Sequence, residues 1–579
     1  MSKKQRGITW RLWVVVVAIA LGGVVITGRL AQLQIIDHNK YAVQARLTHI
    51  SEETLVDRRG ALLDRNGYPL AASEDTFDLL VEQRVWKNPN ISGRASQQLS
   101  EIVGLPPEEL VQAVTGTDIF EVTVVRNLDF DKATAIRELG LRGVRLVTSS
   151  HRVYPEGNIA PQLLGFVGRD NVGLTGLEAD LDSILSGAKG RVREERDALG
   201  NRFALGERSE TAPLPGANVV LTIDRYIQLL AEQELAGVIK EHKATGGTII
   251  VVQPRTGEIL AMASQPTFDV TKLDLSDDSK IALYRNRAIT DQYEPGSVFK
   301  LITTAAGLDT GTVSPNSWWE DTGALHIGPW TIRNWDHSVN GSQTVQQMLS
   351  KSLNTGAAWV AQQTGPAKFY EYIQRFGFGE PSGIGLTGDA PGRVRTPDND
   401  PENWRSVDMA TNSFGQGISV TPIQMVMAVA AIANDGVAMK PHVVKEVVYP
   451  GGSQAAQPEQ VRQVMSAGAA QTLKEMMGVV SDGVSKTYLN VRGYRVGGKS
   501  GTADLVTPDS GYKKDAYISS FVGMAPLENP QLVVLVKIDE PKNLPWGTVV
   551  AAPAFGRLVE RALAYLEVPP QGDALVTAP

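Results

Sequence analysis

The sequence PGSVFKLITTAA, residues 295–306, is the part of the chain that says most about its architecture and its chemistry. Pro295 and Gly296 favour a turn, and the apolar run behind them is typical of a buried helix. Because residues three positions apart share one face of a helix, Lys300 is expected one turn above Ser297. A serine hydroxyl needs an adjacent base, and a lysine whose pKa is lowered by burial and a second cation can be that base. The stretch therefore predicts a catalytic serine at a helix start, where its N–H group can also bind an oxyanion.

The Ser-x-x-Lys spacing is weak evidence by itself, because it recurs at residues 186–189 and 510–513 in glycine-containing loops. Two later motifs strengthen it. Residues 352–354 read Ser-Leu-Asn, and residues 499–502 read Lys-Ser-Gly-Thr beside a strand-like segment. They add a second hydroxyl, an amide and a second ammonium to the first motif. The three motifs in this order indicate one composite active site.

A phosphate-binding loop is the main competing interpretation, because residues 493–500 match the pattern G-x-x-x-x-G-K-S. Such a loop must follow a buried strand and open a helix. The preceding residues 486–492 are polar, and Pro508 and Gly511 oppose a long helix afterwards. The sequence therefore disfavours this interpretation. It also contains no G-x-S-x-G motif, so a nucleophile-elbow hydrolase is unsupported.

The composition narrows the classes of function and the number of domains. A chain of 579 residues exceeds what one compact core usually organises, so two folded domains and an anchor are expected. The net charge of −7 gives no indication of a nucleic-acid partner. The absence of cysteine excludes disulfides, thiolate catalysis and cysteine-based zinc sites, and the seven histidines form no H-E-x-x-H pair.

The N-terminus predicts a membrane anchor. Lys3, Lys4, Arg6 and Arg11 precede an apolar run over residues 12–28. Because positive residues stay on the cytoplasmic side, the rest of the chain is expected outside the cytoplasm. The alternative is a cleaved signal peptide, but the small-x-small triplet at residues 18–20 lies inside the apolar run instead of after it. Residues 30–36 are expected to continue as an amphipathic helix along the membrane surface.

From residue 216 onward, hairpins and helices follow one another and predict an antiparallel sheet flanked by helices. The elements expected in chain order are a strand at 219–224, an amphipathic helix to residue 243, a hairpin over 248–264, a helix from the capping box at Thr421 to a C-terminal Gly436, a hairpin over 521–538 and a final helix over 555–566.

The chain resembles the class B penicillin-binding proteins over nearly its whole length after the anchor. Ordered S-x-x-K, S-x-N and K-T-G motifs mark penicillin-binding proteins and class A β-lactamases, and Leu353 and Ser500 are the departures here. β-Lactamases lack the N-terminal motifs, which specify the class. The stretches that carry the resemblance outside the three motifs are residues 59–71, 152–157, 173–178, 293–297, 415–417 and 421–422.

The resemblance implies a multidomain α and β protein of the bacterial cell membrane, with a single span and a cytoplasmic N-terminus. The arginine, glutamate and glycine residues of the N-terminal motifs are expected to be structural. The implied parts are a cytoplasmic tail (1–11), a transmembrane anchor (12–28), a juxtamembrane segment (29–50), a non-catalytic α/β pedestal domain of the dimerisation type (51–215), a transpeptidase domain with a penicillin-binding, serine β-lactamase-like fold (216–566) and a disordered tail (567–579).

The resemblance also implies a peptidoglycan D,D-transpeptidase acting on a stem peptide that ends in D-Ala-D-Ala. Ser297 would attack the penultimate carbonyl and expel the last D-Ala, and the amine of a neighbouring strand would then attack the acyl-enzyme. Lys300 would be the base, and Ser352 would relay the proton to the leaving amine. The implied substrate-binding residues are Asn354 at the peptide backbone, Lys499 as the positive charge that binds the carboxylate and keeps Lys300 neutral, Ser500 and Thr502 as donors to that carboxylate, and Gly501 between them, with the Thr502 N–H completing the oxyanion hole.

No metal or organic cofactor is implied. The implied partners are stem peptides, β-lactams, other cell-wall synthesis proteins and an integral-membrane glycan polymerase, because the region before residue 216 shows no glycosyltransferase site. Gly22, Gly23 and Gly28 give the anchor small-residue faces for a second transmembrane helix. Residues 520–526 and 539–541 resemble the septal, cell-division type. The alternatives are an elongation-specific transpeptidase, a serine β-lactamase using a residue such as Glu402, a β-lactam sensor and an inert scaffold.

Overall fold

The computed structural model describes residues 3–41, 50–55, 57–116, 119–195, 208–484, 487–507, 511–542 and 544–570. The chain divides into two compact units. One contains Met1–Arg58 with Gly187–Pro215, and the other contains Arg59–Ser186 with Gly216–Pro579. The proposed site residues all belong to the second unit.

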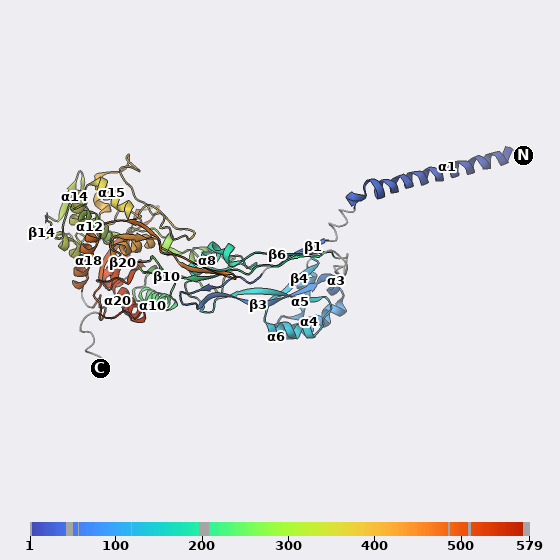
Figure 1. Cartoon of the computed structure of the whole chain (residues 1–579), viewed down its shortest axis with the longest axis horizontal. Helices are drawn as coiled ribbons and strands as arrows, with labels where there is room; N and C mark the ends of the chain where they lie inside the picture. Colours follow the sequence, from blue (N-terminus) through green and yellow to red (C-terminus); the bar gives the residue numbers. More distant parts are fainter. Residues whose placement is uncertain are drawn as a thin grey trace. The chain divides into compact units, whose positions relative to one another are not determined.

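The first unit consists of an N-terminal helix and a small sheet. Helix α1 covers Lys3–Ala31 and a π-helical turn covers Gln32–Ile36 (Figure 1). The 27-residue stretch Trp10–Ile36 has a mean hydropathy of 2.3 and is long and apolar enough to cross a membrane. The sheet is antiparallel and has the order β1 (Ile50–Leu55), β6 (Gly190–Glu195), β7 (Arg208–Thr211).

A five-stranded antiparallel sheet forms the centre of the transpeptidase region, which is the part of the second unit from residue 216 onward. Its order is β10-β9-β21-β20-β19, so β19 lies at an edge. Both predicted hairpins are present in it, as β9 with β10 and as β20 with β21. The strands cover Gly246–Val252 (β9), Ile259–Gln265 (β10), Gly497–Thr507 (β19), Gly511–Ala525 (β20) and Leu532–Asp539 (β21).

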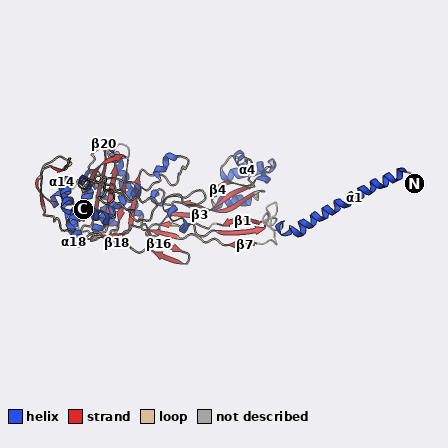
Figure 2. Ribbon diagram, turned by 90° about the horizontal axis from the view of Figure 1, so that it is seen from above, coloured by secondary structure: helices blue, strands red, loops and turns tan. Residues whose placement is uncertain are grey.

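Helices cover both faces of this sheet, because its strands carry apolar residues on both sides. Ile249 and Val251 pack in a cluster with α10 (Arg225–His242) and α20 (Ala552–Tyr565). Ile250 and Val252 point the other way, into a cluster with α12 (Lys300–Asp309), α14 (Asn354–Thr364) and α17 (Pro422–Ala433). This alternation follows the two-residue period of a strand. The predicted fold class, an antiparallel sheet flanked by helices, is confirmed (Figure 2).

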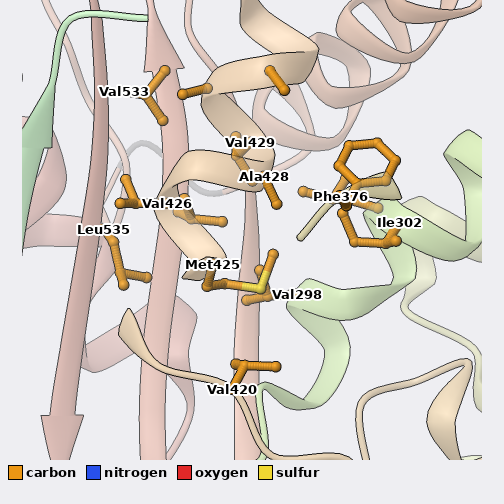
Figure 3. Close-up of a cluster of buried hydrophobic side chains, with 14 of the residues drawn as sticks. Val298, Ile302, Phe376, Val420, Met425, Val426, Ala428, Val429, Val533 and Leu535 are labelled. Atoms are coloured by element: carbon orange, nitrogen blue, oxygen red, sulfur yellow. The ribbon is translucent and has the colours of Figure 1, made fainter. Parts of the chain in front are cut away.

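Helix α17 is the packing link between the sheet and the segment that carries Ser297. Figure 3 shows Met425 and Val426 of α17 between Leu535 of β21 on one side and Val298 on the other. The predicted capping box is present, with Thr421 accepting from the N–H of Gln424 and Gln424 accepting from the N–H of Thr421.

The end of α17 differs from the prediction in one detail. The helix stops at Ala433, and Asp435, with φ of 52°, takes the left-handed position that the sequence assigned to Gly436. Gly436 donates to the carbonyl of Ala431, which places it one residue further along a Schellman turn. An aspartate tolerates this conformation better than most side chains do, so the sequence pattern alone misplaced the turn by one residue.

The pedestal region, defined as Arg59–Ser186, is built on a sheet that continues into the transpeptidase region. The seven-stranded sheet has the order β17-β16-β8-β2-β3-β4, with β5 added to β3, and β2 pairs with β8 in parallel. Helices α4 (Pro89–Val103), α5 (Pro107–Thr115) and α6 (Phe130–Glu138) supply the other side of its apolar core. The remaining strands cover Leu62–Leu63 (β2), Pro69–Glu82 (β3), Glu121–Leu128 (β4), Val144–Val153 (β5), Asn218–Leu221 (β8), Val444–Tyr449 (β16) and Gly452–Ala455 (β17).

Two arginines of the pedestal motifs share one buried glutamate. The Nε atoms of Arg59 and Arg152 each donate to Glu178 at 2.7 Å, and all three side chains are at most 1% exposed. Arg59 also pairs with Asp182 at 2.6 Å. Removal of one member of a buried ion pair costs about 3–5 kcal/mol because the remaining charge is left unpaired. The contacts support the structural role that the sequence assigned to these residues.

Candidate active site

Ser297 lies in a tight turn that leads directly into α12. A 3₁₀ turn covers Gly296–Phe299, and the α-helix begins only at Lys300. The sequence predicted both residues on one α-helix, and the observed 3₁₀ turn differs from that prediction. The three-residue spacing still brings the two residues to the same side. In a 3₁₀ turn, residues three apart stand one above the other, which keeps Ser297 and Lys300 on the same side. Ser297 is half-buried, and its hydroxyl makes no hydrogen bond to any residue within the described ranges.

Backbone packing holds this turn against the neighbouring strand and loop. Gly296 has φ of 57° and donates its N–H to the carbonyl of Gly415 at 3.1 Å. A Cβ atom at Gly296 would lie 2.8 Å from the carbonyl oxygen of Thr502, and one at Gly415 would lie 2.2 Å from that of Gly296. Glycine is therefore required at both positions, because the neighbouring backbone leaves no room for a Cβ atom. The Ser297 turn lies between β19 and the Gly415 loop.

Lys300 points into the interior and is completely buried. Its Nζ donates to the carbonyl of Ser352 at 2.6 Å, to the Ser352 hydroxyl at 3.3 Å and to Oδ1 of Asn354 at 2.9 Å. None of these acceptors carries a charge. Burial, with a smaller contribution from Lys499, holds the pKa of Lys300 well below its ordinary value. The site therefore favours the neutral amine, which is the form that can take a proton from a serine.

Two short helices place Ser352 and Asn354 around Lys300. Helix α13 (Val345–Lys351) ends at Ser352, which adopts φ of 58° at the C-cap position, and α14 begins at Asn354. The left-handed conformation is unfavourable for a side chain other than glycine by roughly 1–2 kcal/mol, and it presents both oxygens of Ser352 to the lysine. The amide nitrogen of Asn354 donates to the carbonyl of Arg333 at 3.1 Å, which fixes the orientation of its Oδ1 atom.

A buried polar network supports Asn354 from behind. The hydroxyl of Thr355 donates to Oδ1 of Asp321 at 2.9 Å, and Asn334 donates to Oδ2 of the same carboxylate at 2.9 Å. Asp321 and Asn334 are each 1% exposed. No sequence motif connects these residues, because their positions lie far apart along the chain.

The third motif lies on β19, the edge strand of the central sheet. Lys499 pairs with Val522 of β20 and is 2% exposed, and its Nζ donates to the carbonyl of Ser500 at 3.0 Å. Burial lowers the pKa of Lys499 to about 8. A strand and not a helix follows the glycine-rich residues 493–498, so the phosphate-binding loop is excluded.

Gly501 and Thr502 bring β19 into contact with the Ser297 turn. A Cβ atom at Gly501 would lie 2.8 Å from Val298 Cγ2 and 2.9 Å from the carbonyl of Pro295, so only glycine fits there. The Thr502 hydroxyl accepts from the N–H of Gly547 at 3.2 Å. Trp546 precedes Gly547, and the centroid of its exposed ring lies 5.0 Å from that of the exposed Trp335.

Other residues that the sequence offered as candidates are not seen to join the Ser297 site. Glu402, the residue that a deacylating enzyme would need, is exposed and its backbone carbonyl accepts from Arg405. Ser186 ends a short helix of the pedestal region, and Ser510 lies outside the described residues. Glu294 was missed as a site residue, although it stands three residues before Ser297 and is 9% exposed.

The fold and the arrangement of the three motifs define the class of the protein as an acyl-transfer enzyme. Comparison with known proteins identifies its family. A family model described as the penicillin-binding protein transpeptidase domain matches residues 247–560, and one described as the penicillin-binding protein dimerisation domain matches residues 55–221. The chain belongs to the class B penicillin-binding proteins.

Relatives and solved structures cover almost the whole chain. Stage V sporulation protein D of Bacillus subtilis is 34% identical over 95% of this chain and 85% of the relative. The peptidoglycan D,D-transpeptidase FtsI of Escherichia coli is 29% identical over 98% of this chain and 94% of the relative. The structure of penicillin-binding protein 2X from Streptococcus thermophilus matches with a TM-score of 0.76 and 25% identity, over 91% of this chain and 81% of that one.

A second solved structure shows a drug complex. Penicillin-binding protein 3 from Mycobacterium tuberculosis, complexed with aztreonam, matches with a TM-score of 0.69 and 26% identity. The match covers 91% of this chain and 100% of that one.

Proposed function

We propose that this protein is a peptidoglycan D,D-transpeptidase that works through an acyl-enzyme on Ser297. The observation that carries the proposal is the environment of Lys300, which is buried against neutral oxygens of Ser352 and Asn354 next to the Ser297 turn. A lysine kept neutral in this way is a competent general base. The relatives named as D,D-transpeptidases supply the class of reaction.

In acylation, Lys300 takes the proton of the Ser297 hydroxyl while Oγ attacks the carbonyl of the penultimate D-Ala. The negative oxygen of the tetrahedral intermediate accepts from the N–H groups of Ser297 and Thr502. The C–N bond then breaks, and the proton returns from Lys300 through the Ser352 hydroxyl to the leaving amine of the terminal D-Ala. Ser352 fits this relay because its hydroxyl is 3.3 Å from Lys300 Nζ.

In deacylation, the amine of a second stem peptide attacks the Ser297 ester. The amine loses a proton to Lys300 as the new amide forms, and Ser297 regains its proton. Glu402, which a hydrolytic enzyme of this kind would need, is exposed. The site therefore favours transfer to an amine over hydrolysis, and β-lactams are expected to be trapped as slowly released esters.

The edge strand β19 is suited to bind the donor peptide. An edge strand offers unpaired backbone groups to an extended peptide, so the stem peptide adds to the sheet beside Lys499. The ammonium of Lys499 attracts the terminal carboxylate, and the hydroxyls of Ser500 and Thr502 donate to it. Asn354 is positioned by Lys300 and Arg333, and its remaining N–H is assigned to the peptide backbone.

The protein is anchored by α1 and is assigned a cytoplasmic N-terminus, with the catalytic domain outside the cytoplasm. The basic residues before the apolar run support this topology. An integral-membrane glycan polymerase is the proposed partner, contacted through the small-residue faces at Gly22, Gly23 and Gly28 and through the pedestal. A septal role is proposed on the relationship to FtsI and on residues 520–526.

The test is reconstitution with a separate glycan polymerase and lipid-linked precursor. The full-length chain should release free D-Ala and form cross-linked muropeptides, and Ser297→Ala should do neither. The chain without the polymerase should form no glycan polymer. Cross-links from Ser297→Ala, or glycan polymer from this chain alone, would contradict the proposal.

A further inference from the structure

Glu294 joins three segments of the active-site region that are distant in the sequence. It belongs to the segment that leads into the Ser297 turn. Its Oε1 accepts from the N–H of Gly417 at 2.8 Å, and both its oxygens lie 3.2 Å from the Tyr512 hydroxyl, which donates. Gly417 lies in the Gly415–Gly417 loop that contacts Gly296, and Tyr512 lies on β20 near the tip of the β19–β20 hairpin.

Two side chains near the start of β20 make polar contacts outside the hairpin: Tyr512 donates to Glu294, and Lys513 pairs with Glu540 at 2.7 Å. A register shift interrupts the pairing between Asp504 and Val506, just beyond the residues that bind substrate. After the shift, Val506 pairs with Tyr512, and these side chains are 47% and 54% exposed. A bulge lets a hairpin bend at that point, so the hydrogen bond from Tyr512 to Glu294 restrains the direction of the paired residues Val506 and Tyr512 beyond the shift.

The carboxyl group of Glu294 is poised to change its charge near neutral pH. The pKa of Glu294 is raised to about 7, with burial as the largest cause. The hydrogen bonds from Gly417 and Tyr512 oppose this rise, and the nearby carboxylate of Asp504 adds to it. The titratable groups that act on it, Tyr512 and Asp504, both belong to the hairpin, and the loop contributes a backbone N–H. Only the ionised carboxylate can accept from both donors with full strength.

We propose that Glu294 is a positioning residue for acylation: its ionised carboxylate ties Tyr512 of β20 and the Gly415–Gly417 loop to the turn that carries Ser297. Protonation weakens both ties, so β19 and the oxyanion-binding N–H groups lose their fixed distance from Ser297. The inference rests on the proposed function, because it concerns how fast Ser297 is acylated. In this proposal Glu294 does not contact the substrate.

The experiment measures the second-order rate constant of acylation by benzylpenicillin from about pH 5.5 to 9 by intact mass, with the full-length chain. Glu294→Gln keeps the size and removes the titration. This variant is expected to acylate about tenfold more slowly at pH 8. It should also lose the part of the decrease in rate at low pH that is due to protonation of Glu294. Tyr512→Phe removes a donor that stabilises the anion, so the acid limb should move to higher pH by roughly half a unit.

Asp504→Asn should move the acid limb in the opposite direction, because it removes a negative neighbour. If Glu294 only stabilised the fold, Tyr512→Phe and Asp504→Asn would not move the acid limb in opposite directions. If Glu294→Gln does not fold, the shifts of the other two variants decide the question. Glu232→Gln is the matched control, since Glu232 of α10 is a half-buried glutamate with a raised pKa that accepts a backbone N–H from Ala160 and a side-chain N–H from Gln228.

The proposal is overturned if the acid limb of the acylation profile lies at the same pH in the wild type, Tyr512→Phe and Asp504→Asn. That result would leave acylation of Ser297 itself intact. A wild-type chain that is not acylated on Ser297 would instead overturn the proposed function. The same shift in Glu232→Gln would assign the effect to general electrostatics and would also overturn the proposal.

Discussion

The pedestal region and the active site each bury two cations, but they accommodate them differently. Arg59 and Arg152 share the carboxylate of Glu178 at 2.7 Å. Lys300 and Lys499 form no ion pair with any residue that the structure describes, and their hydrogen bonds end on neutral oxygens.

The paired arginines serve the structure of the pedestal, whereas the unpaired lysines are suited to chemical reaction. An arginine keeps its proton in a protein, so a shared carboxylate turns two arginines into a fixed structural link. A lysine can lose its proton when it is desolvated near another cation, and burial lowers the pKa of both Lys300 and Lys499. Among the described residues no carboxylate pairs with either lysine, which favours the neutral form of Lys300 that the proposed mechanism needs.

The largest effect is expected from Lys300→Arg, which makes the active-site cation resemble those of the pedestal. The charge stays, but arginine cannot accept a proton from Ser297. Acylation by benzylpenicillin should fall by about a thousandfold or more. Measured labelling above about one hundredth of the wild-type rate would place the base elsewhere. The melting temperature should be measured in parallel to show that the variant is folded.

The converse change, Glu178→Gln, removes the carboxylate from the pedestal cluster. The two buried arginines then lose the carboxylate that they share, and only Arg59 keeps an anionic partner, Asp182, among the described residues. The free energy of unfolding should fall by about 3–5 kcal/mol. Denaturant unfolding of the soluble part checks this value. The matched control is Glu121→Gln, because Glu121 pairs with the half-exposed Arg145 and should contribute less than about 1 kcal/mol. Equal effects of the two variants would contradict the structural role of the buried cluster.

Lys499→Met tests the cost of the unpaired lysine. The folded-state pKa of Lys499, about 8, lies below its ordinary value of 10.5. The unfolded chain therefore binds more protons between these values, and the wild type gains stability as the pH rises through that window. Below about pH 8, the variant should be more stable than the wild type by about 1–3 kcal/mol, and the gain should shrink toward pH 10. Acylation should be strongly reduced at every pH. A variant less stable than the wild type at pH 7 would show that the buried ammonium is not destabilising.

The smallest effect is expected at the capping box of α17, which involves neither cluster. Thr421→Ala removes the hydroxyl that accepts from the N–H of Gln424. Unfolding should become easier by about 1 kcal/mol, and the pH profile of acylation should keep its shape. A changed profile would mean that α17 controls the Ser297 turn more directly than its apolar packing indicates.

The sequence predicted the hairpins, the capping box and the central fold class, because these depend on local periodicity and turn chemistry. It also predicted the three motifs that meet around Lys300. It could not predict the 3₁₀ turn at Ser297 or the left-handed Ser352, since tertiary packing and not propensity imposes them. Asp321 and Glu294 were missed for the same reason: their partners are far away along the chain, and a lone carboxylate in a sequence is usually a surface residue.

The most direct measurement is the position of the penicillin adduct. After labelling of the full-length chain, tryptic digestion separates Ser297, in the peptide of residues 288–300, from Ser352, in residues 352–368, and from Ser500 and Ser510, in residues 500–513. The adduct should be found only on the peptide of residues 288–300 and should persist for many minutes. An adduct on either of the other two peptides, or rapid release of hydrolysed drug, would contradict a slowly deacylating Ser297 activated by an unpaired lysine.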